Sequence, residues 1–303
     1  MFLLAIAFLS ILEIMIRRKS CRIKYLFCGL VTFLCFFTFA NESIITWQTD
    51  HRPPASILKG PYQGQGFIDQ IRDELITQLP QYQHKTSISP LDRLFDDMHR
   101  GKEICHPLLF VTQERMKSAY FSISATITPS MRLIINAEMA EKLNLTEPVN
   151  LEQFINSSRK TFAIVKGRSY GPFIDNVLKK QNNNDTHVKI SVSDNTRLFK
   201  LLEKKRVDFT FAYPFELNYY QTHGSNNNVK FSMLTILGET NYTLGSVACS
   251  KTPWGKAVID DVNQALKMQR KKADYITTMN KWWPQETSKP AFNDFYQNVF
   301  LKN

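Results

Sequence analysis

The sequence lacks the short motifs by which most catalytic and nucleotide-binding sites are recognised. It contains no Gly-x-Ser-x-Gly elbow, no Walker loop and no dinucleotide-binding fingerprint. Its six histidines show no His-x-x-x-His spacing and its cysteines no Cys-x-x-Cys spacing, which disfavours a metal site. No run of five basic residues follows residue 40, and no zinc-finger or RNA-binding signature occurs, so nucleic acid is not an expected partner. We therefore expect a protein without a cofactor, a metal or catalytic residues, and not an enzyme.

Glycine and proline are also scarce, with 11 Gly and 13 Pro among 303 residues. Because 43% of the residues are hydrophobic and 21% are charged, the composition is that of an ordinary globular protein. It excludes a collagen-like, low-complexity or largely disordered chain. The net charge of +11 is a mild excess over this length, which is compatible with an anionic ligand but does not require one.

The first 40 residues consist of two apolar stretches around the basic segment Arg17–Lys24. The second stretch is 16 residues long, which is short for a membrane-spanning helix but typical of a signal-peptide core. Glu13 makes the first stretch a poor membrane helix, so we expect translation to start at Met15. Residues 1–40 are therefore predicted to be a signal peptide, cleaved after Ala40 to release the protein into the periplasm. An uncleaved anchor or helical hairpin, which would hold the protein at the membrane, is the alternative.

Removal of this leader leaves two cysteines, Cys105 and Cys249. An exported chain can join them in one disulfide, and the oxidising periplasm permits that bond. The residues alone leave a second interpretation open, in which both are buried free thiols.

Along the rest of the chain, short runs that favour strands alternate with segments of helical spacing, which is typical of an α/β protein. We expect strands at residues 43–49, 85–89, 104–111, 133–136, 161–165, 188–192, 207–212 and 242–250. We expect helices at residues 67–79, 90–98, 150–158, 172–178, 196–204, 255–270 and 271–283. The alternation restarts after residue 127, which indicates two βαβ-type halves followed by a C-terminal return.

Several short motifs follow one another along the chain: Pro53-Pro54, Gly64–Asp69, Gly101–Cys105, Thr112–Arg115 (Thr-x-Glu-Arg), Tyr120–Ser122, Val207–Phe209 and Trp254-Gly255. Together they resemble the family 3 extracellular solute-binding proteins. Those proteins are the periplasmic receptors of polar amino-acid ABC importers. The resemblance covers residues 44 to about 285 and fits a divergent branch of the family. It implies a fold like the type II periplasmic binding proteins, with two α/β lobes joined by two crossover segments and a ligand cleft between them.

This resemblance also implies how the chain is divided. Residues 41–127 and 243–303 would form lobe 1, and residues 131–238 would be inserted as lobe 2. On such a fold Cys105 and Cys249 lie on adjacent strands of lobe 1, and the resemblance therefore favours the disulfide over two free thiols.

The first candidate ligand-binding residue is Arg115, whose family counterpart binds the ligand carboxylate. A guanidinium suits that task because its planar fork matches two carboxylate oxygens and keeps its charge when water is removed. The alternative is a surface arginine at the start of a helix, paired with Glu114 or Glu103.

A second group of candidates lies in the turn Gly167–Gly171, between a predicted strand and a predicted helix. The resemblance places an anion here, where backbone N–H groups, the Ser169 hydroxyl and the charge of Arg168 can contact it. A simple helix cap is the alternative. Trp47 and Tyr170 are candidates to hold an apolar part of the ligand between their rings, although a place in the core or at the rim explains Trp47 equally well.

The chain departs from the family pattern at Tyr213, where amino-acid receptors usually have an aspartate that pairs with the ligand ammonium. The nearest acidic residue is Glu216. An ammonium buried without a carboxylate is costly, although a tyrosine face offsets part of the cost. Either Glu216 turns toward the ligand, or the ligand has no α-ammonium group.

These features predict a monomeric periplasmic protein that captures a small, carboxylate-bearing, amino-acid-like solute. Crossings near residues 127–132 and 238–243 would act as the hinge. The protein would then dock on an ABC permease or on the outer domain of a sensor. Two alternatives remain open, a membrane-anchored sensory or interaction module and a cryptic hydrolase that uses Glu216.

Overall fold

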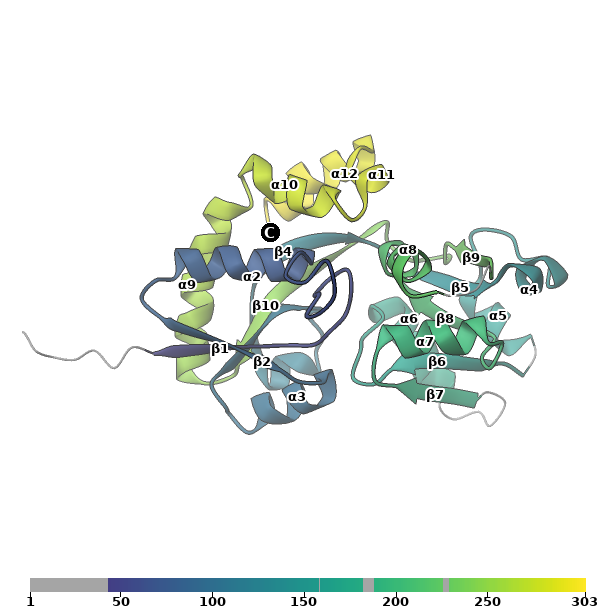
Figure 1. Ribbon diagram of the computed structural model, residues 1–303, viewed down its shortest axis with the longest axis horizontal. Helices are drawn as coiled ribbons and strands as arrows, with labels where there is room; N and C mark the ends of the chain where they lie inside the picture. Colours follow the sequence, from purple (N-terminus) through teal and green to yellow (C-terminus); the bar gives the residue numbers. More distant parts are fainter. Residues whose placement is uncertain (1–42, 158, 182–187, 226–228) are drawn as a thin grey trace, which may run out of the picture. The chain divides into compact units, whose positions relative to one another are not determined.

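The structure is a computed structural model that describes residues 43–157, 159–181, 188–225 and 229–303. The predicted leader, residues 1–40, lies outside the described residues. Residues 44–303 form one compact unit built on two five-stranded sheets with helices packed against them (Figure 1). The two-lobed α/β fold predicted from the sequence is therefore confirmed.

The sheet of lobe 1 has the strand order β2-β1-β3-β10-β4. Its strands are β1 (Ile44–Thr49), β2 (Gln83–Ile88), β3 (Ile104–Leu109), β4 (Ala119–Pro129) and β10 (Tyr242–Ser250). Strands β1, β2 and β3 are parallel, whereas β10 is antiparallel to both β3 and β4. The chain thus returns to lobe 1 through a central strand, β10, after it has built lobe 2.

The helices of lobe 1 cover this sheet with apolar faces. They are α2 (Phe67–Gln78), α3 (Leu91–His99) and α9 (Pro253–Gln269). Helix α2 buries Phe67, Ile68, Ile71 and Leu75, which recur at the three- and four-residue spacing of one helix face. It packs on β3, and α9 packs on β4 and β10.

The sheet of lobe 2 has the strand order β7-β6-β8-β5-β9. Its strands are β5 (Arg132–Asn136), β6 (Thr161–Val165), β7 (Val188–Val192), β8 (Phe209–Ala212) and β9 (Phe231–Leu234). Its helices are α4 (Ala137–Lys142), α5 (Leu151–Asn156), α6 (Pro172–Gln181), α7 (Asn195–Glu203) and α8 (Pro214–His223). The parallel strands β6 and β8 end near the turns that lead into α6 and α8, so both turns reach the same edge of the sheet.

The chain crosses between the lobes twice, and the two crossings are hydrogen-bonded to each other. Ser130 and Met131 connect β4 to β5, and a second segment connects β9 to β10. The Ser130 backbone N–H donates to the carbonyl of Asn241 at 3.0 Å, and the hydroxyls of Thr128 and Thr243 lie 2.8 Å apart. This pairing makes the two crossings a narrow double-stranded link.

The C-terminal residues form a helical cap on lobe 1. The cap comprises α10 (Ala273–Asn280), α11 (Pro284–Thr287), α12 (Pro290–Phe295) and a π-helical turn at Tyr296–Phe300. The buried Arg270 guanidinium donates to the carbonyls of Ser124, Phe300 and Asn303, which fixes the cap to β4. No helix in the described ranges is long and apolar enough to cross a membrane.

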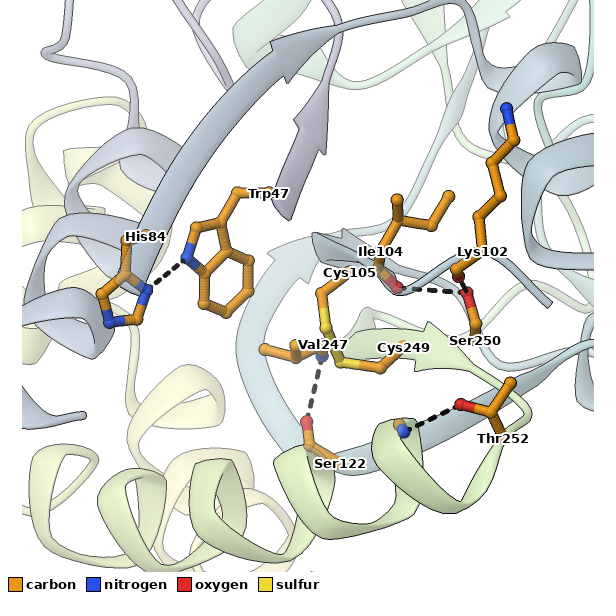
Figure 2. Close-up of a disulfide and its surroundings, with 11 residues drawn as sticks. Trp47, His84, Lys102, Ile104, Cys105, Ser122, Val247, Cys249, Ser250 and Thr252 are labelled. Carbon is orange, nitrogen blue, oxygen red and sulfur yellow. Dashed lines mark hydrogen bonds between the residues drawn. A yellow bond between two sulfur atoms is a disulfide. The ribbon is translucent and has the colours of Figure 1, made fainter. Parts of the chain in front are cut away.

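The expected disulfide between Cys105 and Cys249 is present and fully buried. The two residues face each other in the register of β3 and β10. Figure 2 shows it beside Trp47 and close to the hydrogen bond from the Val247 backbone to the Ser122 hydroxyl. The bond therefore joins two neighbouring strands at the centre of lobe 1.

Candidate functional site

A cavity of about 50 Å³ lies between the lobes and is lined by residues of both; we call it the interlobe cavity. Four of its lining residues are charged: Arg52, Arg115, Arg168 and Glu216. The others are mostly apolar or aromatic: Ala55, Phe67, Ile68, Leu91, Leu108, Leu109, Phe110, Thr126, Thr128, Ser169, Tyr213, Phe215 and Gly245. The interlobe cavity is thus an apolar space with several guanidinium groups in its wall.

Arg115 begins a single 3₁₀ turn, Arg115–Lys117, just before β4 and is only 8% exposed. Its Nη1 donates to the carbonyl of Phe110 in lobe 1 at 3.0 Å, and its Nη2 donates to the carbonyl of Gly167 in lobe 2 at 3.2 Å. The guanidinium also lies over the Phe95 ring, 4.8 Å from its centroid. Arg115 therefore joins the two lobes through backbone carbonyls.

No carboxylate of the described residues forms an ion pair with Arg115. Glu114, one of its alternative partners, pairs with Lys117 at 2.6 Å. Burial lowers the pKa of Arg115 to about 10, so the group stays charged at neutral pH. The charge of Asp175 opposes this lowering without forming an ion pair with Arg115. A buried, charged guanidinium that lacks an ion-pair partner attracts an anion.

Arg168 and Glu216 form a buried ion pair inside lobe 2. The shortest distance, from Arg168 Nη2 to Glu216 Oε2, is 2.8 Å, and the two side chains are 3% and 1% exposed. Burial, the largest influence, would lower the pKa of Arg168, but the charge and hydrogen bond of Glu216 together with Tyr170 and Tyr213 outweigh burial and raise the pKa. Arg168 Nη1 also donates to Asn195 Oδ1 at 2.8 Å. Both candidates line the interlobe cavity, but their charges neutralise each other.

In the turn before α6, several polar groups are already hydrogen-bonded to other groups of the protein. Asp175 accepts from the Tyr170 backbone N–H at 2.8 Å and from the Ser169 hydroxyl, and the same hydroxyl accepts from the Gly171 N–H at 3.3 Å. Ser169 lines the interlobe cavity, whereas Tyr170 does not. The Tyr170 hydroxyl instead accepts from the Val165 N–H at 2.8 Å.

Trp47 is fully buried in the core of lobe 1 and does not line the interlobe cavity. Its indole N–H donates to His84 Nδ1 at 3.1 Å, as Figure 2 shows. Tyr213, by contrast, lines the interlobe cavity and stacks on Phe215 with the ring centroids 4.8 Å apart. Of the two aromatic candidates for ligand packing, Trp47 and Tyr170, neither lies in the cavity wall.

The sequence analysis did not identify Phe215, a lobe 2 residue that packs on lobe 1. Its ring lies 5.7 Å from Phe67 and 4.8 Å from Trp283, centroid to centroid. The sequence signal was the segment Tyr213–Glu216, in which the predictions concerned Tyr213 and Glu216. Phe215 makes the apolar wall of the interlobe cavity continuous across both lobes.

Arg52 is a further cavity residue that the sequence analysis missed. Its Nη2 lies 3.9 Å from Asp50 Oδ1, and His106 Nε2 lies 3.9 Å from the same oxygen. Burial would raise the pKa of Asp50, but Arg52 and then His106 outweigh it and lower the pKa to about 2. Arg52 therefore has a loose counter-ion, in contrast to Arg115.

The lobes also approach each other at Gly167. Its φ is +76°, and a Cβ there would lie 3.0 Å from the backbone nitrogen of Asp92 in lobe 1. The adjacent Lys166 forms an ion pair with Asp92 at 2.7 Å. Only a residue without a side chain fits this approach without displacing the lobes.

Solved structures share this fold, but all those described below have low sequence identity to this chain. No protein-family model matches the sequence, and no curated protein matches it. A substrate-binding protein of an amino acid ABC transporter shares 16% identity at a TM-score of 0.60, over 80% of this chain and 100% of that chain.

Two further solved structures have the same fold. The periplasmic VFT2 domain of BvgS from Bordetella pertussis shares 13% identity at a TM-score of 0.56, over 80% of this chain and 94% of that chain. An ancestral amino acid-binding protein, a precursor of cyclohexadienyl dehydratase, shares 15% identity at a TM-score of 0.60, over 80% of this chain and 95% of that chain. The resemblance stated from the sequence motifs is thus confirmed at the level of the fold.

Proposed function

We propose that this protein is a periplasmic solute-binding protein that closes its two lobes around a small carboxylate-bearing solute. The observation that carries the proposal is Arg115, a buried and charged guanidinium in the wall of the interlobe cavity without a carboxylate partner among the described residues. A carboxylate in that cavity would supply the missing counter-ion through charge-assisted hydrogen bonds. The solved structures of amino-acid-binding proteins with this fold support a binding role.

In this proposal residues 41–127 and 243–303 act as lobe 1, and residues 131–238 act as lobe 2. The paired crossings serve as the hinge, because they are the narrow link between the two sheets. Contacts from both lobes to one solute favour the closed arrangement over the open one. Arg115 of lobe 1 and Ser169 of lobe 2 are the proposed solute contacts.

A thermal-shift screen of the purified protein with carboxylates, amino acids, peptides and sugars tests the proposal. At least one carboxylate should raise the melting temperature, because a ligand that binds only the folded state stabilises it. Arg115→Met should abolish that shift. Arg100→Met removes an equal charge from an exposed site on lobe 1 and should preserve it. The proposal fails if no carboxylate stabilises the protein, or if Arg115→Met binds unchanged.

The periplasmic partner is the second part of the proposal. An ABC permease fits the neighbour from an amino acid ABC transporter, and release of the protein after cleavage at Ala40 suits that partner. A membrane-anchored sensory module is the second candidate, favoured by the BvgS domain. Mass spectrometry of the N-terminus of the exported protein separates them, because cleavage frees a receptor and retention tethers a module.

A hydrolase that uses Glu216 has little support from the contacts of this residue. A general base must reach the proton that it removes, whereas Glu216 is 2% exposed and is hydrogen-bonded to Arg168 and Asn195. We therefore propose a binding protein rather than an enzyme.

A further inference from the structure

The proposed solute-binding function leaves the chemical class of the solute open. Resting on that function, we propose that the solute is a small carboxylic acid with an apolar body and no α-ammonium group, rather than a free amino acid. The proposal rests on the charged groups in the wall of the interlobe cavity and on the partners that each of them has in the protein.

The acceptor capacity of Glu216 is fully used by the protein. Its Oε1 accepts from Arg168 Nη2 at 3.0 Å and from Asn195 Nδ2 at 2.8 Å. Its Oε2 accepts from the same Nη2 at 2.8 Å and from the Tyr213 backbone N–H at 3.1 Å. A carboxylate has about four lone-pair sites, so these four hydrogen bonds saturate it. Glu216 has no acceptor left for a solute ammonium.

The other nearby carboxylates lie outside the cavity lining. Among the described residues that line the interlobe cavity, Glu216 is the acidic one. Asp50 is not in the lining, and its Oδ1 lies 3.9 Å from both Arg52 and His106. Asp175 accepts from Ser169 and the Tyr170 backbone. A zwitterionic solute would therefore place its ammonium beside guanidinium groups without an acidic partner, which is unfavourable in a site with little water.

Of the three arginines in the wall of the interlobe cavity, one forms no ion pair within the described part of the chain. Arg168 is neutralised by Glu216, and Arg52 is partly neutralised by Asp50. Arg115 uses two of its five donors on backbone carbonyls and has no carboxylate partner in the described part of the chain. A monoanion neutralises this excess, whereas a zwitterion adds no net charge.

The remaining wall suits an apolar solute body. Phe67, Ile68 and Leu108 of lobe 1 and Phe215 of lobe 2 all line the interlobe cavity. The interlobe cavity is small, with a volume of about 50 Å³. That space favours an acid with a short carbon chain.

Calorimetric titration with butyrate and 2-aminobutyrate tests the proposal, because the two probes differ only in the α-ammonium group. Butyrate should bind at least about tenfold more tightly, since only the amino acid must bury an unpaired ammonium. Butyramide, which has the same shape but no charge, should not bind measurably. Equal or tighter binding of 2-aminobutyrate overturns the inference and leaves the solute-binding function intact.

The variant Tyr213→Asp adds an acid to the cavity wall and sharpens the test. It should raise the affinity for 2-aminobutyrate relative to butyrate, and an unchanged ratio would count against the inference. If neither probe binds, the titration is extended to linear acids of two to six carbons and their 2-amino derivatives. Binding by acids alone supports the inference, and tighter binding by the amino derivatives overturns it. If no member of either series binds, the inference fails, and the thermal-shift screen decides separately on the solute-binding function.

Discussion

Arg115 and Arg168 are two buried arginines in the wall of the same cavity, but their surroundings differ. Arg168 has Glu216 at 2.8 Å and is neutralised within lobe 2. Arg115 reaches only backbone carbonyls, one in each lobe. Burying a charge is costly unless it is paired, so an arginine that stays unpaired is more readily explained by a solute than by folding. The presence or absence of a counter-ion, more than the residue type, therefore distinguishes a structural arginine from one that binds a ligand.

The largest expected effect is on the stability of the paired arginine. Arg168→Met should lower the free energy of unfolding by about 3–5 kcal/mol, because it leaves the Glu216 carboxylate buried without its partner. Arg115→Met should cost less than half as much, since it removes a charge that has no protein counter-ion. Urea unfolding monitored by circular dichroism measures both.

The double variant Arg168→Met with Glu216→Leu is the control for this comparison. It removes both charges and should recover most of the stability that Arg168→Met loses. Equal losses for Arg115→Met and Arg168→Met would contradict the distinction between the two arginines.

The next effect concerns the core of lobe 1, away from the interlobe cavity. Replacing Cys105 and Cys249 with serine should cost about 2–4 kcal/mol of unfolding free energy, because the disulfide closes a long loop in the unfolded chain. The affinity of the folded variant for a carboxylate should change little, since neither residue lines the cavity. A large loss of affinity at full folding would show that the disulfide positions the site.

A smaller effect is expected at the contact between the lobes. Gly167→Ala should weaken solute binding by about five- to tenfold, because its Cβ would press on the backbone of Asp92 only when the lobes are closed. Gly60→Ala is the matched control, since Gly60 also has a positive φ of +91° but no atom within 4 Å of its Cβ position. Comparable losses of affinity in both variants, measured by titration, would mean that backbone strain explains the effect.

The last effect appears only at acidic pH and concerns Arg52, whose counter-ion is loose. Asp50 has a folded pKa of about 2, below its ordinary value of 3.8. Its stabilising contribution is therefore complete above about pH 4 and is lost as the pH falls through about 2, amounting to about 2 kcal/mol. Thermal unfolding of Asp50→Asn should lack this component between pH 5 and pH 2. Parallel profiles for the variant and the unaltered protein would refute it.

Much of the fold could be predicted from local sequence pattern. The strands at residues 161–165 and 188–192 have the predicted bounds, and helix α2 ends within one residue of its predicted end. Helix α8, which was not predicted, has apolar residues on all sides and so shows no clear stripe. Pro214 at its first position and Glu216 in its first turn were the available signal.

The candidate site was harder to predict than the fold. Arg115 and Ser169 were identified because short motifs carry them, and both line the cavity. The pairing of Arg168 with Glu216 joins residues 48 positions apart, and only the packing of the turns before α6 and α8 brings them together. Trp47 is an aromatic residue of the kind that often packs against ligands. Its position on strand β1, however, places its side chain in the core of lobe 1.

A crystal structure of the protein grown with butyrate would show whether Arg115 binds the solute carboxylate. We expect a carboxylate in the interlobe cavity, with an oxygen about 2.7–2.9 Å from a guanidinium nitrogen of Arg115. The Arg168–Glu216 pair should remain intact. Electron density for the acid outside the cavity, or on Arg168 after its separation from Glu216, would contradict the account.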